Sequence, residues 1–341
     1  MVNSAATKPT VLPDTATPRP RFWQGRTGSQ KLFVLSALTP MILYVAFWSL
    51  LPIVWAAALA FFDYSARRQG GVVLGLGGDN PFVGLQHFRN MLNFSPEAPL
   101  EVRLFHISVK TTLMFAFLVV PLNMLITLPL AAMIESTGRR LRLALRTIFF
   151  LPVVTSSVGV AIMWGYILHP QRGLLNAGIG SVMGRMVAIN WTGDPSLVIG
   201  PIPVALIAVI IAYLWQDIGY NLIIFIAALQ GIPESIRDAA IMDGATGFTM
   251  FRHITLPLLR PTILLAAILT MISAFQVFDI FQVMTRGGPD NQTRVLTFDI
   301  YDNAFRFQNM GWAAATSVVL FVIVLAISLL QNRMLRSEWE Y

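Results

Sequence analysis

Apolar residues in this sequence lie in long blocks, and not in the short periodic stretches that are typical of a soluble domain. A helix needs about 20 apolar residues to cross the hydrocarbon core of a bilayer. Six blocks meet that length and are predicted to be membrane spans: about Leu32–Phe62, Thr111–Ile134, Ile148–Leu168, Leu197–Leu229, Thr262–Met284 and Trp312–Leu330. The pattern therefore predicts an all-α integral membrane protein with six transmembrane helices.

The composition and charge of the chain agree with this prediction. Of the 341 residues, 55% are hydrophobic and 12% are charged, which is about half the charged fraction of a soluble protein. The formal net charge of +7 does not indicate a nucleic-acid partner, because the basic residues are scattered around the apolar blocks. Basic residues in those places set the topology of a membrane protein. The chain has no cysteine, which excludes thiol nucleophiles and cysteine-based zinc sites.

Arginines crowd the short connection after the second apolar block, at Arg139, Arg140, Arg142 and Arg146. Short connections rich in Lys and Arg face the cytoplasm, so this cluster predicts that both termini are cytoplasmic. Residues 1–31 are rich in Pro, Thr and Ala and are predicted to be a disordered cytoplasmic tail. Residues 32–336 then form the transmembrane domain, and residues 337–341 form a cytoplasmic C-terminal end.

The connection between the fourth and fifth blocks reads "GIPESIRDAAIMDGATGF". Ile236, Ala239, Ala240 and Asp243 share one narrow face of a predicted short helix, because they stand at positions i, i+3, i+4 and i+7. Gly231 suits the left-handed position that ends the preceding helix. Gly244 is predicted to have a positive φ and to turn the chain sharply. These residues alone leave two interpretations open, an ordinary interfacial loop and a docking element.

Acidic residues occur inside the fourth and fifth blocks, where a charged side chain is costly and usually faces a cavity or a partner. Aromatic rings and amides lie near them in the sequence. Such groups suit the C–H faces and hydroxyl groups of sugars. The candidate residues of a solute path are Trp215, Gln216, Asp217, Tyr220, Asn221, Gln276, Phe278 and Asp279. The alternative is that these side chains pair across helices or with a partner subunit.

Sequence motifs of a motor or an enzyme are absent. The chain has no G-x-x-x-x-G-K-[ST] phosphate-binding loop, no H-E-x-x-H metal motif and no G-x-S-x-G nucleophile motif. We therefore expect neither a catalytic site nor a metal site, and no cofactor in this chain.

The connection at residues 231–257 resembles the EAA loop of binding-protein-dependent ABC importer permeases, whose pattern is E-A-A-x-x-D-G-A followed by I-x-L-P. The matching residues here are Asp238, Ala239, Ala240, Asp243, Gly244 and Ala245. Aspartate replaces glutamate at Asp238, which keeps the charge and shortens its reach by one methylene. The stretches "NPFVGLQHF", "FFLPVVTSSVGVAIMWGYI" and "FDIFQVMTRGGPDNQT" also resemble segments of the sugar-type branch of this family.

The resemblance implies the type I ABC importer permease fold in the cytoplasmic membrane of a bacterium or archaeon. It implies one permease subunit of an ATP-driven carbohydrate importer, with four kinds of partner: a homologous second permease, two ABC ATPase subunits, an extracytoplasmic solute-binding protein and the lipid bilayer. The ATPases would bind ATP and Mg, and the six loop residues would couple their closure to alternating access.

Other functions fit the sequence less well. A glycerol-phosphate importer resembles the same branch, but no Lys or Arg lies at mid-span to attract an anion. A secondary transporter needs an internal repeat, and a membrane-embedded enzyme needs a clustered nucleophile and base. Neither is visible in the sequence.

Overall fold

The computed structural model describes residues 28–68 and 78–335. The predicted N-terminal tail lies outside the described residues except for its last four, which begin the first helix. The predicted C-terminal end, residues 337–341, also lies outside them. The chain divides into two compact units, Met1–Trp55 and Ala56–Tyr341.

Helices dominate both units, with three short π-helical segments (η) among them. The elements are α1 (Gly28–Val45), η1 (Ala46–Leu50), α2 (Leu51–Leu59), α3 (Gln86–Met91), α4 (Leu100–Glu135), α5 (Arg139–Val154), α6 (Ser157–Ile167), α7 (Leu174–Met183), β1 (Val198–Ile199), β2 (Ile202–Pro203), α8 (Val204–Gln230), α9 (Glu234–Met242), α10 (Gly247–Met250), η2 (Phe251–Thr255), α11 (Leu256–Leu258), α12 (Arg260–Phe275), α13 (Asp279–Met284), α14 (Leu296–Tyr301), η3 (Asp302–Arg306) and α15 (Met310–Leu335).

The first unit consists of α1, η1 and the start of α2. The helical stretch Leu32–Leu59 is long and apolar enough to cross a membrane, as predicted for the first span. Its apolar side chains are exposed within this chain, with Phe47 and Trp48 at 64% and 74%. Such a surface suits contact with lipid tails or another apolar helix.

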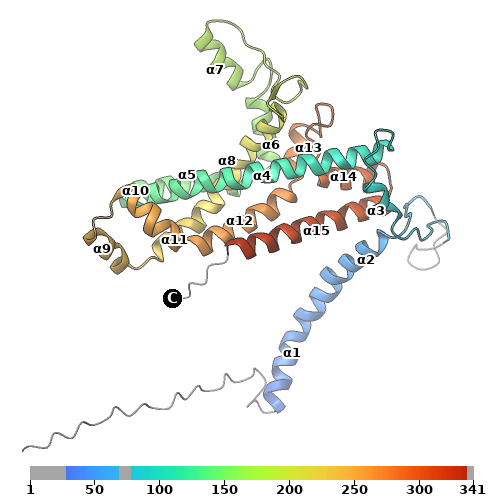
Figure 1. Ribbon diagram of the computed structural model, residues 1–341, viewed down its shortest axis with the longest axis horizontal. Helices are drawn as coiled ribbons and strands as arrows, with labels where there is room; N and C mark the ends of the chain where they lie inside the picture. Colours follow the sequence, from blue (N-terminus) through green and yellow to red (C-terminus); the bar gives the residue numbers. More distant parts are fainter. Residues whose placement is uncertain (1–27, 69–77, 336–341) are drawn as a thin grey trace, which may run out of the picture. The chain divides into compact units, whose positions relative to one another are not determined.

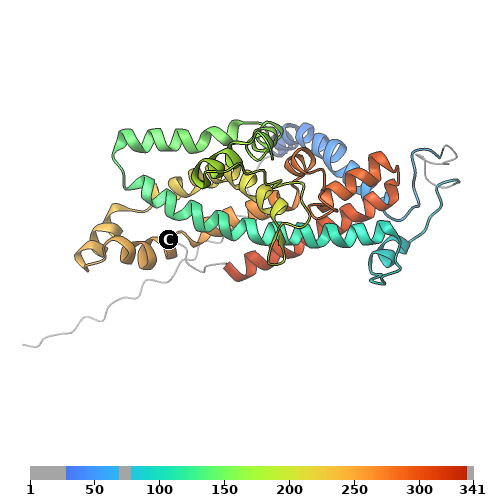
Figure 2. The same ribbon diagram turned by 90° about the horizontal axis from the view of Figure 1, so that it is seen from above.

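Long helices of the second unit lie lengthwise in a bundle, with α4 packed against α8 and α12 (Figure 1, Figure 2). The α9–α10 region lies at one end of the bundle, and α3 lies at the other. Helix α4 has 36 residues, which gives about 54 Å of helix, against about 30 Å of hydrocarbon. It begins at Leu100, and not at Thr111 as predicted, because Glu101 and Arg103 hide its first turns from a hydropathy pattern.

The predicted third and fourth spans differ from the helices in the structure. The predicted span Ile148–Leu168 is divided between α5 and α6, which meet at a 100° bend. Thr155 ends α5 in an extended conformation, three residues after Pro152. The predicted span Leu197–Leu229 begins at Val204, because β1 and β2 form a short hairpin before it. The described residues contain four helices of spanning length, or up to six spans if each of two bent pairs counts as one. These pairs are α5 with α6, and the helical stretch Gly247–Leu258 with α12.

The predicted span Thr262–Met284 is also interrupted. Helix α12 begins at Arg260 and ends at Phe275, three non-helical residues follow, and α13 begins at Asp279. The predicted last span, Trp312–Leu330, lies within a longer helix, α15. Hydropathy could not reveal the break, because Val277, Ile280 and Phe281 are apolar and buried.

Aromatic side chains form the centre of the bundle. Phe115 on α4 packs edge-on against Tyr213 on α8 at 5.3 Å and against Phe281 on α13 at 5.0 Å between ring centroids. Phe115 and Phe281 are completely buried. Edge-to-face pairs at such distances are favourable beyond the area they bury. This cluster holds α4, α8 and α13 together next to the cavity described below.

Candidate functional site

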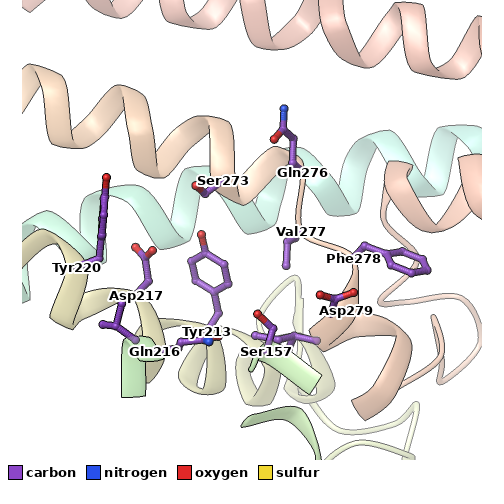
Figure 3. A pocket seen from close by; sticks show the side chains of 12 residues that line it. Ser157, Tyr213, Gln216, Asp217, Tyr220, Ser273, Gln276, Val277, Phe278 and Asp279 are labelled. Carbon is purple, nitrogen blue, oxygen red and sulfur yellow. The ribbon is translucent and has the colours of Figure 1, made fainter. Parts of the chain in front are cut away.

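A cavity of about 530 Å³ lies among α5, α6, α8, α12 and α13. Figure 3 shows its lining side chains, several of which point into the space between α8 and the end of α12. The lining residues are Val153, Ser157, Tyr213, Gln216, Asp217, Tyr220, Ser273, Gln276, Val277, Phe278, Asp279 and Ile280. A cavity of this volume lies within the range typical of small-molecule sites.

Six of the eight predicted solute-path residues line this cavity: Gln216, Asp217, Tyr220, Gln276, Phe278 and Asp279. The other two do not. Trp215 is directed to Trp164 on α6, with ring centroids 6.4 Å apart. Asn221 is completely buried and contacts Asp217 from behind the cavity wall. Sequence spacing could not separate these two from Gln216, Asp217 and Tyr220, because all five lie within two helical turns of α8.

The break between α12 and α13 brings the lining residues of the predicted fifth span together. Gln276 ends α12, with its backbone N–H bonded to the carbonyls of Ile272 and Ser273. Phe278 has φ −134° and ψ −55°, so the helix cannot pass through it. Non-helical backbone at membrane depth is tolerated where it is buried in protein or lines a cavity. Here it lines the cavity.

The cavity wall combines aromatic rings with hydrogen-bonding groups. Tyr213, Tyr220 and Phe278 supply rings, while Gln216 donates from Nε2 to the backbone carbonyl of Thr155 at 2.8 Å. Carboxyl groups come from Asp217 and Asp279, and none of the lining residues is Lys, Arg or His. The wall can therefore accept hydrogen bonds from hydroxyl groups and stack against apolar faces, and it offers no cation to an anionic ligand. Three further lining residues were not predicted, because the prediction started from acidic residues and their neighbours. They are Tyr213, Ser157 and Ser273.

A second candidate surface lies at the α9 end of the bundle, on the loop that the sequence singled out. Pro233 precedes α9 as its N-cap, and Gly244 turns the chain after α9 with φ 81°, as predicted. The prediction for Gly231 is wrong. Gly231 has φ −76°, because its N–H continues the hydrogen bonding of α8 to Ala227 and Ala228. Thr246 then precedes α10 in an extended conformation.

The six predicted loop residues differ in exposure. Asp238, Ala239, Asp243 and Gly244 are exposed, and Ala245 is half-buried. Ala240 is only 6% exposed, and its carbonyl accepts from the N–H of Ala245 at 2.9 Å. In this chain Ala240 therefore packs within the loop, and its methyl group is not part of the accessible surface.

Apolar side chains on this loop project outward and were missed in the sequence. Met242 is 87% exposed, Phe248 71% and Ile241 55%. In the sequence they look like ordinary apolar residues of a short helix, so nothing there indicated that they are exposed. Asp238 and Ala245 line a hollow of about 560 Å³ beside them. The loop therefore presents exposed apolar side chains next to acidic groups, and such a surface is suited to a protein partner.

Two arginines of the predicted topology-setting cluster pair with an acid near this loop. Glu135, at the end of α4, forms ion pairs with Arg142 at 3.4 Å and with Arg146. Gln230, at the end of α8, donates to the same carboxylate at 3.3 Å. These contacts join the ends of α4 and α8 to the first half of α5. Arg139 and Arg140 remain exposed.

Comparisons with known proteins agree with this architecture. A family model described as "Binding-protein-dependent transport system inner membrane component" matches residues 127–337. The chain is 32% identical to the sn-glycerol-3-phosphate transport system permease protein UgpA of Agrobacterium fabrum (strain C58), over 84% of this chain and 90% of that protein. It is 32% identical to the trehalose/maltose transport system permease protein MalF of Thermococcus litoralis, over 74% of this chain and 79% of that protein.

A solved structure supports the fold. The crystal structure of a bacterial ABC transporter involved in the import of the acidic polysaccharide alginate superposes with a TM-score of 0.74 and 23% identity, over 92% of this chain and 98% of that chain. This chain therefore belongs to the family of binding-protein-dependent transport system inner membrane components, and it is a multi-pass permease subunit of an ABC importer.

Proposed function

We propose that this permease subunit carries part of the path of an uncharged, polyhydroxylated solute, a sugar or a polyol. The observation that carries the proposal is the lining of the cavity. Aromatic rings, amides and two carboxyl groups surround it, and its lining includes no basic side chain. Hydroxyl groups can donate to the carboxyl groups, and the C–H faces of a sugar can stack on the rings.

An anionic solute is the alternative, since relatives include glycerol-phosphate permeases. A phosphate or carboxylate in this cavity would approach Asp217 and Asp279 without a compensating cation from this chain. Like charges in a low-dielectric site repel strongly. The lining therefore favours a neutral solute, in line with the relative named for trehalose and maltose.

The proposed assembly contains this chain, a homologous second permease, two ABC ATPase subunits and an extracytoplasmic solute-binding protein, in the cytoplasmic membrane of a bacterium or archaeon. The α9 end of the bundle faces the cytoplasm. ATP and Mg bind to the ATPase subunits, and the loop with Asp238, Asp243 and Gly244 contacts one of them. Closure of the ATPases then moves the short helices α9 and α10, which are joined to α8 and α12.

The test is solute-stimulated ATP hydrolysis by the complex purified with its companion subunits and reconstituted in liposomes. The panel contains maltose, trehalose, glycerol and sorbitol as neutral solutes, and glycerol 3-phosphate and an alginate oligosaccharide as anions. We expect stimulation by at least one neutral solute. Stimulation by the anions alone would overturn the proposed solute class, and uptake that follows an ion gradient without ATP would overturn the proposed mechanism.

A further inference from the structure

Behind the cavity wall, a network of polar side chains joins three of the bundle helices. Asn123 on α4 donates from Nδ2 to Oδ2 of Asp217 on α8 at 2.7 Å. Nδ2 of Asn221 on α8 shares its two hydrogens among three acceptors: Oγ1 of Thr270 on α12 at 2.8 Å, Oδ1 of Asn123 at 3.0 Å and the same oxygen of Asp217 at 3.3 Å. Asn123, Asn221 and Thr270 are at most 2% exposed. The sequence pattern placed no site on α4, so Asn123 and Thr270 were not predicted.

The orientation of the Asn123 amide is set by its own acceptor contacts. Its Oδ1 accepts from the hydroxyl of Thr127 at 2.9 Å and from Nδ2 of Asn221 at 3.0 Å. A flipped amide would place its oxygen against Oδ2 of Asp217 and its Nδ2 against Nδ2 of Asn221, although Thr127 could then accept where it now donates. The contacts with Asp217 and Asn221 therefore favour the orientation in which Nδ2 faces Asp217. Asn123 therefore acts on Asp217 in one fixed direction, as a donor.

Asp217 is the member of this network that also lines the cavity. Both donors converge on Oδ2. Oδ1 accepts no hydrogen bond from the described residues. Figure 3 shows the carboxyl group of Asp217 beside Tyr213 and Tyr220, directed to the space below Ser273. One oxygen is thus held by the helices while the other is available to a group inside the cavity.

Buried polar side chains in a membrane bundle have two explanations. They can hold helices together, where one such bond contributes a modest amount on average. They can also serve a solute path, which is the default explanation for an intramembrane acid. The convergence of two amides on a single oxygen of a cavity-lining carboxyl group favours the second explanation, because helix pairing alone does not require the other oxygen to remain available.

We propose that Asn123 is a positioning residue of the solute site, and that it acts together with Asn221. The two amides hold Oδ2 of Asp217, so that Oδ1 accepts a hydrogen bond from a hydroxyl group of the solute. This inference rests on the proposed function, since it assigns a role within the same cavity. Preorganised groups bind more tightly because less conformational freedom is lost on binding.

The experiment compares four variant complexes with the wild type, all reconstituted in liposomes. ATP hydrolysis is measured over a range of concentrations of the neutral solute that most stimulates the wild type: maltose, trehalose, glycerol or sorbitol. Asn123→Leu removes the donor at similar volume. We expect the half-saturating solute concentration to rise about tenfold, and to change more than the maximal rate. Ser108→Ala is the matched control, since Ser108 is buried on the same helix with an Oγ that has no partner among the described residues. We expect its half-saturating solute concentration and its maximal rate to match those of the wild type.

The third complex carries Asn123→Asp together with Asp217→Asn. This exchange keeps a donor and an acceptor in contact but moves the carboxyl group out of the cavity wall. We expect thermal stability to recover while the half-saturating concentration stays raised. Recovery of both would show that the pair only joins helices, and would overturn the inference.

The fourth variant is Thr127→Val, which removes only the hydroxyl that donates to Oδ1 of Asn123. It is the milder variant if Asn123→Leu does not assemble. We expect a smaller rise in the half-saturating concentration in the same direction. Normal half-saturation in both Asn123→Leu and Thr127→Val would overturn the inference alone. A wild-type complex that responds to none of the neutral solutes would instead overturn the proposed function and this inference with it.

Discussion

Arg294 and Asp299 form an ion pair that is enclosed by protein, with Nη2 of the arginine 2.9 Å from Oδ1 of the aspartate and side-chain exposures of 5% and 1%. A second acid, Asp302, accepts from Nη1 of the same guanidinium at 2.8 Å. One buried cation therefore compensates two buried carboxylates. The site links the turn after α13 to α14 and η3, at the α3 end of the bundle.

Replacement of Arg294 by methionine should destabilise the fold strongly. The substitution keeps the apolar volume but leaves Asp299 and Asp302 without their cation, and breaking a buried pair costs about 3–5 kcal/mol. We expect a clear fall in the Tm of the detergent-purified protein. Arg306→Met is the control, since Arg306 contacts Asp302 with a side chain that is 57% exposed, and an exposed pair contributes only about 0–1 kcal/mol. An equal fall in Tm in Arg294→Met and Arg306→Met would contradict this account.

Acid should relieve part of the damage in Arg294→Met. Burial raises the pKa of Asp299, and Arg294 opposes that rise. A carboxyl group with a folded-state pKa above its unfolded value contributes most to stability at low pH, and this contribution is lost as pH rises through the folded pKa. Removing Arg294 enlarges the difference between the folded-state pKa and the unfolded-state pKa of Asp299. The Tm gap between variant and wild type should therefore narrow as pH falls from neutral, and a gap that widens would contradict the expected sign.

Gly219 on α8 should not tolerate a side chain. A Cβ there would lie 2.1 Å from the carbonyl oxygen of Phe149 and 2.7 Å from a methyl group of Val153, both on α5. Small residues allow such close helix contacts in membranes. Gly219→Ala should push α5 away from α8, lower the Tm and disturb the cavity wall at Val153. Gly165→Ala on α6 is the control, because open space surrounds it and alanine favours helix by about 1 kcal/mol. An unchanged Tm in Gly219→Ala would contradict this prediction, because it would show that α5 and α8 can separate without loss of stability.

Gly244 should be required for coupling because of its backbone. Its φ of 81° is costly for a β-branched residue, of order 1–3 kcal/mol. Gly244→Val should therefore displace α10 relative to α9, and we expect loss of solute-stimulated ATP hydrolysis while the binding protein still captures solute. Gly138→Val is the control, since Gly138 has φ −63° and nothing within 4 Å of its added Cβ. Normal stimulated turnover in Gly244→Val would contradict the coupling role.

Met242 should contribute to docking of the ATPase. It is 87% exposed at the end of α9, so its replacement changes the surface without disturbing the core. Met242→Ser should weaken co-purification of the ATPase subunit and leave the Tm of the permease unchanged. Met186→Ser is the matched control, because Met186 is a completely exposed methionine that follows α7. Co-purification that is equally strong in both variants would remove Met242 from the proposed contact.

The cavity among α5, α6, α8, α12 and α13 illustrates why only part of the candidate site was predictable. Asp217 and Asp279 drew attention because a charge among apolar residues is costly, and both line the cavity. Tyr213 and Ser273 line it too, but a tyrosine or serine in a span is common and carries no such signal. Asn123 lies 94 positions from Asp217 in the chain, and only helix packing brings their side chains together.

The long apolar blocks were enough to predict a helical membrane protein, because block length and the cost of burying charge are local properties. The sequence by itself also determined the turn at Gly244, since one residue's freedom at positive φ decides it. The positions of the breaks became known from the tertiary structure, because Val277, Phe278, Ile280 and Phe281 keep the predicted fifth span apolar across its break. The tertiary structure also decided that Ala240 packs inward, that Trp215 turns toward Trp164, and which oxygen of Asp217 is held. These outcomes depend on contacts between helices, and the pattern along a single helix does not contain them.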